Sequence, residues 1–356
     1  MRKKKILLIG WDSNICLSVL YCLKSHNFDF YLLTHNPKNA ARFSIYIKKV
    51  YYYDQNENIG ERIINIMKDQ KFDLIMPYDE IETRKIKEVS ERLNAFTQCT
   101  WGTDPEMFNK GIHKLELANF LKQHNIPCPY FTTYDNKVEL QEMIKTFDFP
   151  LLIKPVRSSA GRNIQKIFDL PTLDKFFENK NIDSKNFMIQ PFLIGSDVTC
   201  NVICKHGEVI CHTIQESPIK TGEEFNANDN LTFKEDAGVI KIVREMMKLL
   251  QWHGVACVDL RRDIRNNQAY ILEINGRFWA SVAPSLDKAG VNFPLILAKL
   301  SMGEPITIPT QKEATQISIS EYLKQARKRK LLPLNATKFG SYLHDPIARA
   351  AQILKK

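Results

Sequence analysis

Three polar residues alternate along one short stretch of the chain, at Glu273, Asn275 and Arg277. The stretch reads AYILEINGRFW, with Ile274 and Gly276 at the intervening positions. Because side chains alternate between the two faces of a β-strand, the carboxylate, the amide and the guanidinium would all point the same way. A solvated edge strand explains this pattern as simply as a functional site does.

A metal site is the chemistry that these residue types support. Mg²⁺ bound to nucleotide phosphates takes a few hard oxygen ligands from the protein, as carboxylates and amides provide. Asp259 lies inside the preceding apolar run, where an unpaired carboxylate is costly to bury. A turn near residues 265–267 would bring Asp259 beside Glu273, and two adjacent acids repel each other unless a cation lies between them. The alternative is that a nearby arginine pairs with these acids: Arg261, Arg262 or Arg277.

A phosphate site is suggested further upstream, where Lys154 ends the apolar run LLIKP. A loop of small polar residues follows at 158–162, with the sequence SSAGR. Fixed cations and the backbone N–H groups of such loops are what phosphates require. An ordinary surface turn is the competing interpretation of this segment.

The first hundred residues alternate between strand and helix patterns. Apolar runs predict strands at residues 5–10, 28–33, 49–53 and 72–77. Helical spacing predicts helices at residues 13–24, 59–69 and 80–93. Strands separated by helices imply a parallel sheet with helices on its faces. A nicotinamide-dinucleotide site is disfavoured, because a single glycine, Gly10, follows the first strand and no acid ends the second.

The pattern changes after residue 101. A helix is predicted at 113–123, and Pro127 and Pro129 then favour an extended linker. Residues 187–217 predict successive strands with turns at Gly195 and at 206–207. Residues 218–233 are polar and show no periodicity, which predicts a long loop, and such loops are usually either lids or disordered.

The last third of the chain is predicted to close the main unit. A helix is expected at 236–252, with its apolar side facing the core, followed by two strands joined by a turn at 263–267 and a helix at 294–302. Beyond Pro305, a further helix begins with a capping box at Ser318 and Glu321. That helix carries a run of basic residues: Lys324, Arg327, Lys328, Arg329 and Lys330. These bases form either a solvated face or a surface that binds polyanions or membranes.

Composition excludes several classes of protein. The 356 residues are 44% hydrophobic and 25% charged, as expected for a globular protein of two or three domains. No apolar run approaches the roughly 20 residues of a membrane span, and the segment after the basic start is too short for a secretory signal, which predicts a cytoplasmic protein. The eight cysteines form no Cys-x-x-Cys pair and are predicted to be reduced and mostly buried. The net charge of +10 fits a polyanionic ligand without specifying one.

The order of several short motifs resembles the ATP-grasp superfamily. In chain order the motifs are His113-Lys114, NIPCP at 125–129, LLIKP with its small-residue loop, IQPFLIGSD at 189–197, VDL, LEINGRF and AGVNFP at 289–294. The chain is most similar to carboxylate-amine ligases that resemble a single synthetase half of carbamoyl-phosphate synthase. The resemblance covers nearly all of residues 1–305. No single motif is specific to the superfamily, but the order and spacing of the motifs together are specific.

The resemblance implies an α/β fold. An N-terminal parallel-sheet domain, the pre-ATP-grasp domain, would occupy residues 1–100. A two-lobed α+β ATP-grasp fold would follow at 101–305, with its small lobe at about 115–190, and residues 306–356 would form a C-terminal segment. The implied cofactors are ATP and Mg²⁺, for which Mn²⁺ is an alternative.

The resemblance also assigns a role to each matching position. Lys114 and Lys154 would neutralise ATP phosphates, and Asp197 would hold the ribose hydroxyls. The mobile phosphate loop would contain Ser158, Ser159, Gly161 and Arg162. The hinge strand whose backbone binds adenine would contain Gln190, Pro191, Phe192 and Leu193. The metal ligands would be Asp259, Glu273 and Asn275. Arg277, the catalytic candidate together with Lys154, would steady the transferred phosphoryl group or the substrate carboxylate.

The sequence also departs from the family pattern. The phosphate loop has a single glycine, Gly161, and Asp197 stands where the family more often has glutamate. After Arg277 the chain reads FWASVAPSLD. This lacks both the acid-rich continuation of biotin carboxylases and the Gly-x-Thr continuation of D-alanine ligases, which puts both substrate assignments in doubt. The unit has no second copy, which argues against complete carbamoyl-phosphate synthesis.

The function predicted from these features is ATP-dependent joining of a small carboxylate to an amine. Substrate contacts are expected from Trp279, Ser281, the 218–233 loop, and loops at 11–14 and 78–80. A carboxylase or a kinase of the same superfamily is the alternative enzyme. A non-catalytic polyanion-binding protein that uses the basic helix at 320–331 is the alternative from another class. The partners are expected to be small molecules and not nucleic acid, and a homodimer is compatible with the sequence.

Overall fold

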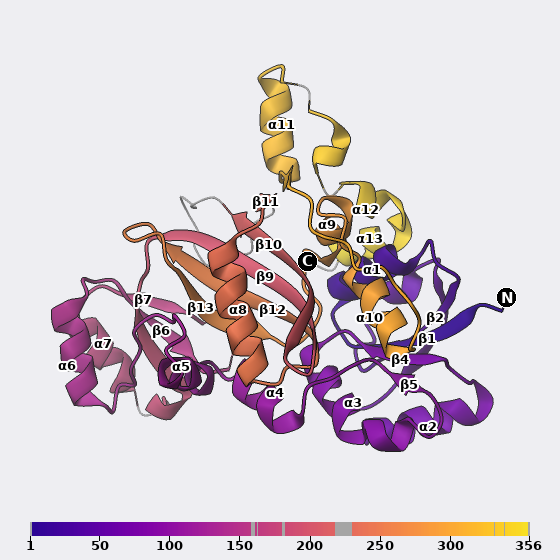
Figure 1. The fold of residues 1–356 in the computed structure, drawn as a ribbon, viewed down its shortest axis with the longest axis horizontal. Helices are drawn as coiled ribbons and strands as arrows, with labels where there is room; N and C mark the ends of the chain where they lie inside the picture. Colours follow the sequence, from indigo (N-terminus) through magenta and orange to yellow (C-terminus); the bar gives the residue numbers. More distant parts are fainter. Residues whose placement is uncertain are drawn as a thin grey trace.

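Three β-sheets organise the chain, as Figure 1 shows. The computed structural model describes residues 2–157, 161, 163–179, 182–217, 230–330, 332–337 and 339–354. The sheets contain five, six and three strands. The sequence prediction of a parallel sheet followed by a two-lobed α+β unit is confirmed.

The N-terminal sheet is parallel, with the strand order β3-β2-β1-β4-β5. Its strands are β1 (Lys4–Ile9), β2 (Phe28–Thr34), β3 (Ile47–Tyr52), β4 (Leu74–Pro77) and β5 (Gln98–Cys99). Its helices are α1 (Ser13–Leu23), η1 (Ala40–Phe43), α2 (Ile59–Asp69) and α3 (Glu80–Leu93). Ile6 and Leu8 pack in one cluster with α1, whereas Leu7 and Ile9 pack in another with α2 and α3. The continuous apolar run of β1 therefore reflects burial of the strand on both faces.

A three-stranded antiparallel sheet forms the small lobe, with the order β7-β6-β8. Its strands are β6 (Leu151–Pro155), β7 (Gln165–Ile167) and β8 (Phe187–Pro191). The helices of this part of the chain are α5 (Lys114–Gln123), α6 (Lys137–Thr146), α7 (Leu170–Phe177) and the short η2 (Ser184–Asn186). Leu140 and Met143 of α6 and Leu173 of α7 pack against Leu151 and Ile153 of β6. We had not predicted α6 or α7, because neither shows a long apolar stripe.

A six-stranded antiparallel sheet forms the large lobe, with the order β13-β12-β9-β10-β11-β14. Its strands are β9 (Gly195–Lys205), β10 (Glu208–Ser217), β11 (Leu231–Phe233), β12 (Gly254–Asp263), β13 (Ala269–Asn275) and β14 (Ala314–Gln316). The sequence predicts a long loop at 218–233, and this prediction is wrong for the last three residues, which form β11. Leu231 and Phe233 are buried, and β11 pairs with β10 and β14. Residues 218–229 lie outside the described residues.

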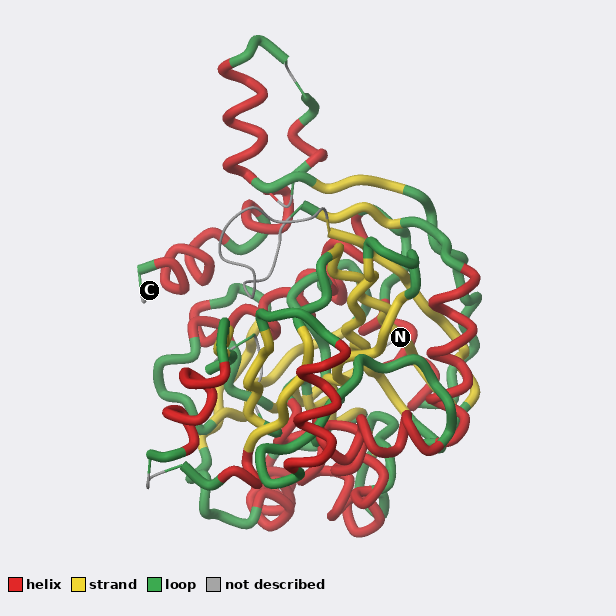
Figure 2. Tube along the Cα trace, turned by 90° about the vertical axis from the view of Figure 1, so that its left-hand side faces the viewer, coloured by secondary structure: helices red, strands yellow, loops and turns green. Residues whose placement is uncertain are grey.

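Helix α8 (Ala237–Leu249) covers one face of the large sheet (Figures 1 and 2). Its apolar side packs against apolar residues of β9 and β12, such as Cys200, Val202 and Val258. The prediction that this helix faces the core is confirmed. Because side chains alternate along a strand, the residues between these apolar positions point to the opposite face, which carries polar side chains such as Thr199, Asn201 and Asp259.

The remaining helices connect the lobes and form the C-terminal segment. They are α4 (Pro105–Ile112), α9 (Val282–Asp287), α10 (Phe293–Ser301), α11 (Ile319–Arg327), η3 (Leu334–Ala336), α12 (Phe339–Leu343) and α13 (Pro346–Ile353). Helix α11 projects from the body of the molecule (Figure 2), and Ser318 caps it by accepting a hydrogen bond from the Glu321 N–H. This is one half of the predicted capping box, because the Ser318 N–H donates to Asn230 Oδ1 and not to Glu321. Helix α13 returns to pack against α1, with Ala348 in the same core as β1. The domain boundaries at residues 100 and 305 stay a prediction.

All eight cysteines are free, and six of them are buried. Among the residues that the structure describes, no helix is long and apolar enough to span a membrane.

Candidate active site

A cavity of about 470 Å³ lies against the polar face of the large sheet. Residues of β6 and β8 line it at one end, and residues of α1, the segment after β13, and the C-terminal helices line it at the other. Four strands of the large sheet, β10, β9, β12 and β13, contribute its floor. A volume of this size holds a small-molecule ligand.

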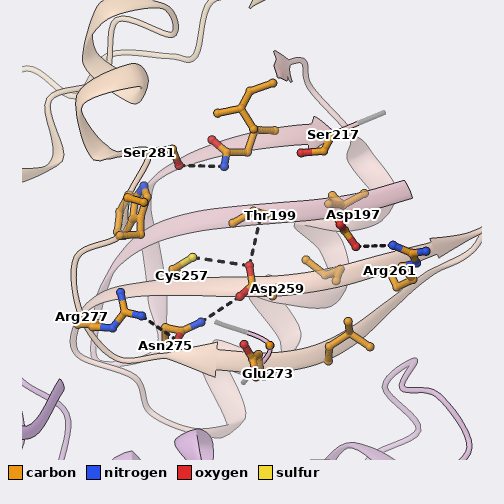
Figure 3. Close-up of a pocket in the computed structure, with 18 of the residues that line it drawn as sticks. Asp197, Thr199, Ser217, Cys257, Asp259, Arg261, Glu273, Asn275, Arg277 and Ser281 are labelled. Carbon is orange, nitrogen blue, oxygen red and sulfur yellow. Dashed lines mark hydrogen bonds and ion pairs between the residues drawn. The ribbon is translucent and has the colours of Figure 1, made fainter. Parts of the chain in front are cut away.

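The predicted metal ligands lie together on this floor (Figure 3). The register pairs Asp259 of β12 with Glu273 of β13, and pairs Asp259 with Thr199 of β9 on its other side. Asn275 lies two residues beyond Glu273 and therefore on the same face. The prediction that a turn brings Asp259 beside Glu273 is confirmed, and β13 is not a solvated edge at these positions.

Hydrogen bonds fix the orientation of the Asp259 carboxylate. Its Oδ1 accepts a bond of 3.1 Å from the Thr199 hydroxyl, and its Oδ2 accepts one of 3.0 Å from the Asn275 amide nitrogen. The amide oxygen of Asn275 in turn accepts a bond of 3.3 Å from Arg277 Nη2. Burial raises the pKa of Asp259, and the neighbouring charge of Glu273 raises it further. A bound cation would oppose both effects.

A lysine, rather than an arginine, pairs with Glu273. Lys114 Nζ lies 2.7 Å from Glu273 Oε2, and the lysine side chain is 6% exposed. The three arginines considered from the sequence have other partners. Arg261 bonds to Asp197, Arg262 bonds to Glu216 and Asp236, and Arg277 bonds to Asn275 and to the carbonyl oxygen of residue 278. Among the described residues, therefore, no arginine forms an ion pair with Asp259 or Glu273.

Two carboxylates and one amide are a donor set that fits Mg²⁺ shared with nucleotide phosphates, because that ion keeps water and phosphate oxygens as its other ligands. The described residues contain no group of three or more histidine, cysteine, aspartate or glutamate side chains placed so that it could hold a metal ion. A site closed by protein ligands alone, as structural zinc requires, is therefore not present among them.

Lys154 approaches the cavity from β6. It is 7% exposed, and its strand neighbour Leu152 is paired with Gln190 of β8, which also lines the cavity. Burial lowers the pKa of Lys154 to about 8, while the negative charge of Glu273 acts in the opposite direction. No acid among the described residues is hydrogen-bonded to Lys154, and such a buried cation is well suited to bind phosphate.

The predicted hinge residues line the same end of the cavity. They are Gln190, Pro191, Phe192 and Leu193. Asp197 lines the cavity as well, but its Oδ1 accepts a hydrogen bond of 2.6 Å from Arg261 Nη1. Arg261 Nε donates to the Leu193 carbonyl oxygen at 3.0 Å and so ties the hinge to the large sheet. Part of the hydrogen-bonding capacity of Asp197 is therefore already used.

The predicted phosphate loop is described only in part. Gly161 lines the cavity and has a φ of +67°, a backbone conformation that glycine adopts without strain. Ser158, Ser159 and Arg162 lie outside the described residues.

Gly276 allows β13 to approach α4. A Cβ atom on this glycine would lie 2.3 Å from Cε2 of the Phe108 ring. Only glycine fits between Asn275 and Arg277, which explains the Asn-Gly-Arg sequence.

Replacement of Gly276 by alanine is expected to destabilise the protein by about 1–3 kcal/mol, because overpacking forces side chains and backbone to shift. Thermal unfolding followed by circular dichroism would measure the loss as a lower Tm. Gly340→Ala is the control, since no neighbouring atom lies within 4 Å of a Cβ at that position. Equal Tm values for both variants would contradict the close packing of Gly276 on Phe108.

The sequence analysis missed four residues of the cavity floor: Thr199, Gln215, Cys257 and Arg261. Each lies on the face shared with Asp259, a fact that follows from the register of β9, β10 and β12 and not from any local motif. Burial raises the pKa of the Cys257 thiol well above its ordinary value, so this group is a poor nucleophile at neutral pH.

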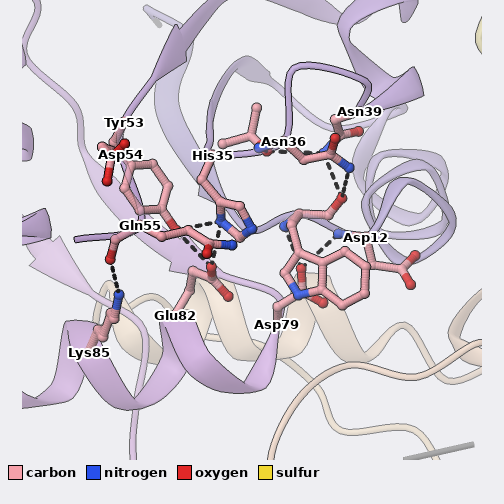
Figure 4. Close-up of polar contacts among 12 residues, drawn as sticks. Asp12, His35, Asn36, Asn39, Tyr53, Asp54, Gln55, Asp79, Glu82 and Lys85 are labelled. Atoms are coloured by element: carbon pink, nitrogen blue, oxygen red, sulfur yellow. Dashed lines mark hydrogen bonds and ion pairs between the residues drawn. The ribbon is translucent and has the colours of Figure 1, made fainter. Parts of the chain in front are cut away.

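The carboxyl end of the parallel sheet carries a second group of polar contacts (Figure 4). Asp79 Oδ2 accepts bonds of 2.6 and 2.9 Å from the backbone N–H groups of residues 11 and 12, and burial raises the pKa of Asp79 to about 7. Glu82 Oε1 accepts a bond of 2.7 Å from the Tyr53 hydroxyl and lies 3.4 Å from His35 Nδ1. These contacts hold the loops after β1, β2, β3 and β4 together.

Substrate contacts predicted from the sequence fall partly on the cavity. Its lining includes Asp12, Asn14, Trp279 and Ser281. Within the described part of the chain, residues 78–80 do not contribute to it. The predicted contact from the 218–233 segment falls mostly outside the described residues, although Leu231 lines the cavity.

Comparison with known proteins agrees with this architecture. Residues 112–281 match the family model of the ATP-grasp domain. This part of the chain, a little under half of its length, is similar to an ATP-grasp domain. The family resemblance predicted from the motifs is therefore confirmed.

The chain is also similar to curated proteins of known name. It is 21% identical over 346 residues to the carbamoyl phosphate synthase large chain of Archaeoglobus fulgidus, a match that covers 90% of this chain and 30% of that protein. It is 25% identical over 212 residues to the D-alanine--D-alanine ligase of Carboxydothermus hydrogenoformans, covering 54% of this chain and 68% of the ligase. The chain thus spans less than a third of the length of the large synthase chain.

Two solved structures share the fold. N5-carboxyaminoimidazole synthetase from Staphylococcus aureus, complexed with ADP, superposes with a TM-score of 0.69 at 13% identity, covering 92% of this chain and 87% of that one. The L-amino acid ligase from Bacillus licheniformis superposes with a TM-score of 0.64 at 14% identity, covering 85% and 75%. At these identities the likeness establishes the fold alone.

Proposed function

We propose that the protein is an ATP-dependent ligase that joins a small carboxylate to an amine. The observation that carries this proposal is the single cavity in which Lys154 and Lys114 lie at the same site as Asp259, Glu273, Asn275 and Arg277. Cations for phosphates and hard oxygen donors for Mg²⁺ are the groups that phosphoryl transfer requires. Several of the similar proteins are, by name, ligases or synthases.

The proposed reaction has two steps. A substrate carboxylate oxygen attacks the terminal phosphorus of ATP, which forms an acyl phosphate and releases ADP. The amine then attacks the acyl carbon, the C–O bond to phosphate breaks, and an amide and inorganic phosphate result. Mg²⁺, when bound by Asp259, Glu273 and Asn275, would neutralise the charge that develops on the phosphoryl oxygens.

The chain's own residues would position the reactants. Lys154 and Lys114 would hold the phosphates, and residues 190–193 would hold the base. Arg277, kept in place by the Asn275 amide and the backbone at residue 278, would hold the transferred phosphoryl group or the carboxylate. Positioning and charge neutralisation can supply most of the rate enhancement of such a transfer, so no protein nucleophile is required.

A panel assay tests the proposal. The protein is incubated with ATP and Mg²⁺ and with small carboxylates, amino acids and bicarbonate, each alone and with an amine acceptor, and ADP release is measured. The ligase predicts ADP release that depends on a carboxylate, with an amide product when the amine is present. ADP release that depends on bicarbonate alone would indicate a carboxylase instead. ATP turnover that no panel compound changes would contradict the ligase proposal.

A further inference from the structure

The cavity continues beyond Arg277 into a part that the proposed reaction does not use. We define this distal end by five lining residues: Asn14, Ser18, Gln215, Trp279 and Arg349. Asn14 and Ser18 come from α1, Trp279 from the segment after β13, and Arg349 from α13. In Figure 3, Ser281, which bonds to Gln215, and Arg277 lie at the opposite end of the floor from Asp197 and Arg261. The distal end is therefore remote from the proposed nucleotide end.

Arg349 is a buried cation with neutral partners. It is 4% exposed, its Nη1 donates to Asn14 Oδ1 and Gln352 Oε1, both at 3.0 Å, and its Nη2 donates to Ser18 Oγ at 3.5 Å. Its Nε has no hydrogen-bond partner among the described residues. Burying a guanidinium without an anion is unfavourable, and a carboxylate or phosphate is its best complement.

Asp345, one helical turn before Arg349, is an acid that interacts electrostatically with the guanidinium. It attracts the guanidinium electrostatically but forms no ion pair with it in the described structure. Asp345 therefore offsets part of the positive charge without occupying the donor at Nε. A purely structural role, in which Arg349 fastens α13 to α1, does not explain why Nε is buried without a hydrogen-bond partner among the described residues.

Two further buried polar atoms accompany Arg349 at the distal end. Trp279 Nε1 and Gln215 Oε1 have no hydrogen-bond partner among the described residues, although their side chains are 3% and 6% exposed. The Gln215 amide is held in place because its Nε2 donates to Ser281 Oγ at 2.9 Å. Buried polar groups normally have partners, so three such atoms on residues that line one cavity indicate a polar ligand.

We propose that the distal end binds a second anionic group of the acid substrate, through Arg349 Nε with Trp279 Nε1 as an additional donor. This inference rests on the proposed function for its assignment to the acid that is activated. The acid would then be a small dianion: one carboxylate lies beside Arg277 for phosphorylation, and a second carboxylate or a phosphate lies at Arg349. Guanidinium groups bind both oxyanions through charge-assisted hydrogen bonds.

Matched compounds test the inference by equilibrium binding without ATP. Aspartate and asparagine, glutamate and glutamine, succinate and succinamate, and O-phosphoserine and serine differ mainly in one anionic group. Isothermal titration calorimetry on the full chain should show at least one dianion that binds at least about tenfold more tightly than its neutral counterpart, a difference typical of one charge-assisted contact. The carboxylate pairs and the phosphoserine pair distinguish the two oxyanions.

Four variants assign this preference to Arg349. Arg349→Gln should reduce it to less than about threefold, and Arg349→Lys should retain part of it. Asn14→Asp changes little in shape but places a carboxylate beside Nη1, so it should also remove the preference even if Arg349→Gln folds poorly. Arg244→Gln, on the exposed side of α8, should leave it unchanged. Tm and circular dichroism report whether each variant folds.

The outcomes separate this inference from the proposed function. A preference that survives in both Arg349→Gln and Asn14→Asp, or the absence of any preference in the unaltered chain, would overturn the distal anion site. Carboxylate-dependent ADP release without such a preference would leave the ligase proposal intact and remove the inference alone. A preference that depends on Arg349, in a protein without carboxylate-dependent ADP release, would retain the anion site and remove the ligase proposal.

Discussion

Replacement of Glu273 by glutamine is expected to reduce carboxylate-dependent ADP release by about a hundredfold or more, because a neutral amide binds Mg²⁺ far more weakly than a carboxylate. Glu273 is paired with Asp259 in the register of β12 and β13, and its Oε2 lies 2.7 Å from Lys114 Nζ. The Mg²⁺ concentration that gives half of the maximal rate should rise at the same time. Initial rates over a series of Mg²⁺ concentrations would measure both effects.

The Glu273 variant also removes the partner of a buried lysine, which by itself lowers stability. Asp259→Asn separates the two effects, because it alters the metal site and leaves the pair of Lys114 and Glu273 in place. Glu245→Gln, exposed on α8, controls for the change of one carboxylate to an amide. Full activity in Glu273→Gln and Asp259→Asn, at unchanged Mg²⁺ dependence, would show that these residues are not metal ligands.

Replacement of Lys154 by methionine is expected to raise the KM for ATP by about tenfold to a hundredfold, since it removes a buried charge-assisted contact to phosphate. Methionine keeps most of the aliphatic volume, so β6 should pack as before. In the unaltered protein, kcat/KM for ATP should fall as pH rises through about 8, where Lys154 loses its proton. The variant should lack this fall. A fall of the same size at the same pH in Lys154→Met would assign the titration to another group.

The lowered pKa of Lys154 also predicts how the stability of the protein changes with pH. Its pKa is about 8 in the folded protein and returns to its ordinary value of 10.5 on unfolding. Between these values the unfolded chain binds more protons, so the contribution of Lys154 to stability increases as pH rises from about 8 to 10.5. The Tm of Lys154→Met should therefore exceed that of the unaltered chain at pH 7, and the difference should shrink above pH 8.

Local sequence patterns predicted the parallel sheet well because its strands are buried on both faces. The boundaries of α2 and α3 agree with the structure, since each helix has a clear apolar stripe and a polar residue before its first turn. Helices α6 and α7 were missed because they cover a small three-stranded sheet and need few apolar residues. The strand Leu231–Phe233 was missed because three residues are too few to show alternation.

Local patterns alone predicted the part of the candidate site to which residues close together in sequence contribute, and the family resemblance added Lys114 and Asp197. Glu273 and Asn275 share one strand, Arg277 follows two residues after its end, and the turn before β13 brings in Asp259. The pairing of Lys114 with Glu273 depends on how α5 packs beside the large sheet, which no local pattern encodes. The contribution of Arg349 depends on α13 returning across the chain to α1, a contact between residues 335 positions apart. Such long-range contacts come from tertiary packing and not from motifs.

The formation of an acyl phosphate is tested most directly by following oxygen from the substrate carboxylate. With a carboxylate labelled with ¹⁸O and unlabelled ATP and water, the account predicts one ¹⁸O atom in the inorganic phosphate for each amide formed, because the C–O bond to that oxygen breaks in the second step. Mass spectrometry of the phosphate would detect the label. Amide formation with unlabelled phosphate would contradict the proposed activation of the carboxylate by phosphoryl transfer.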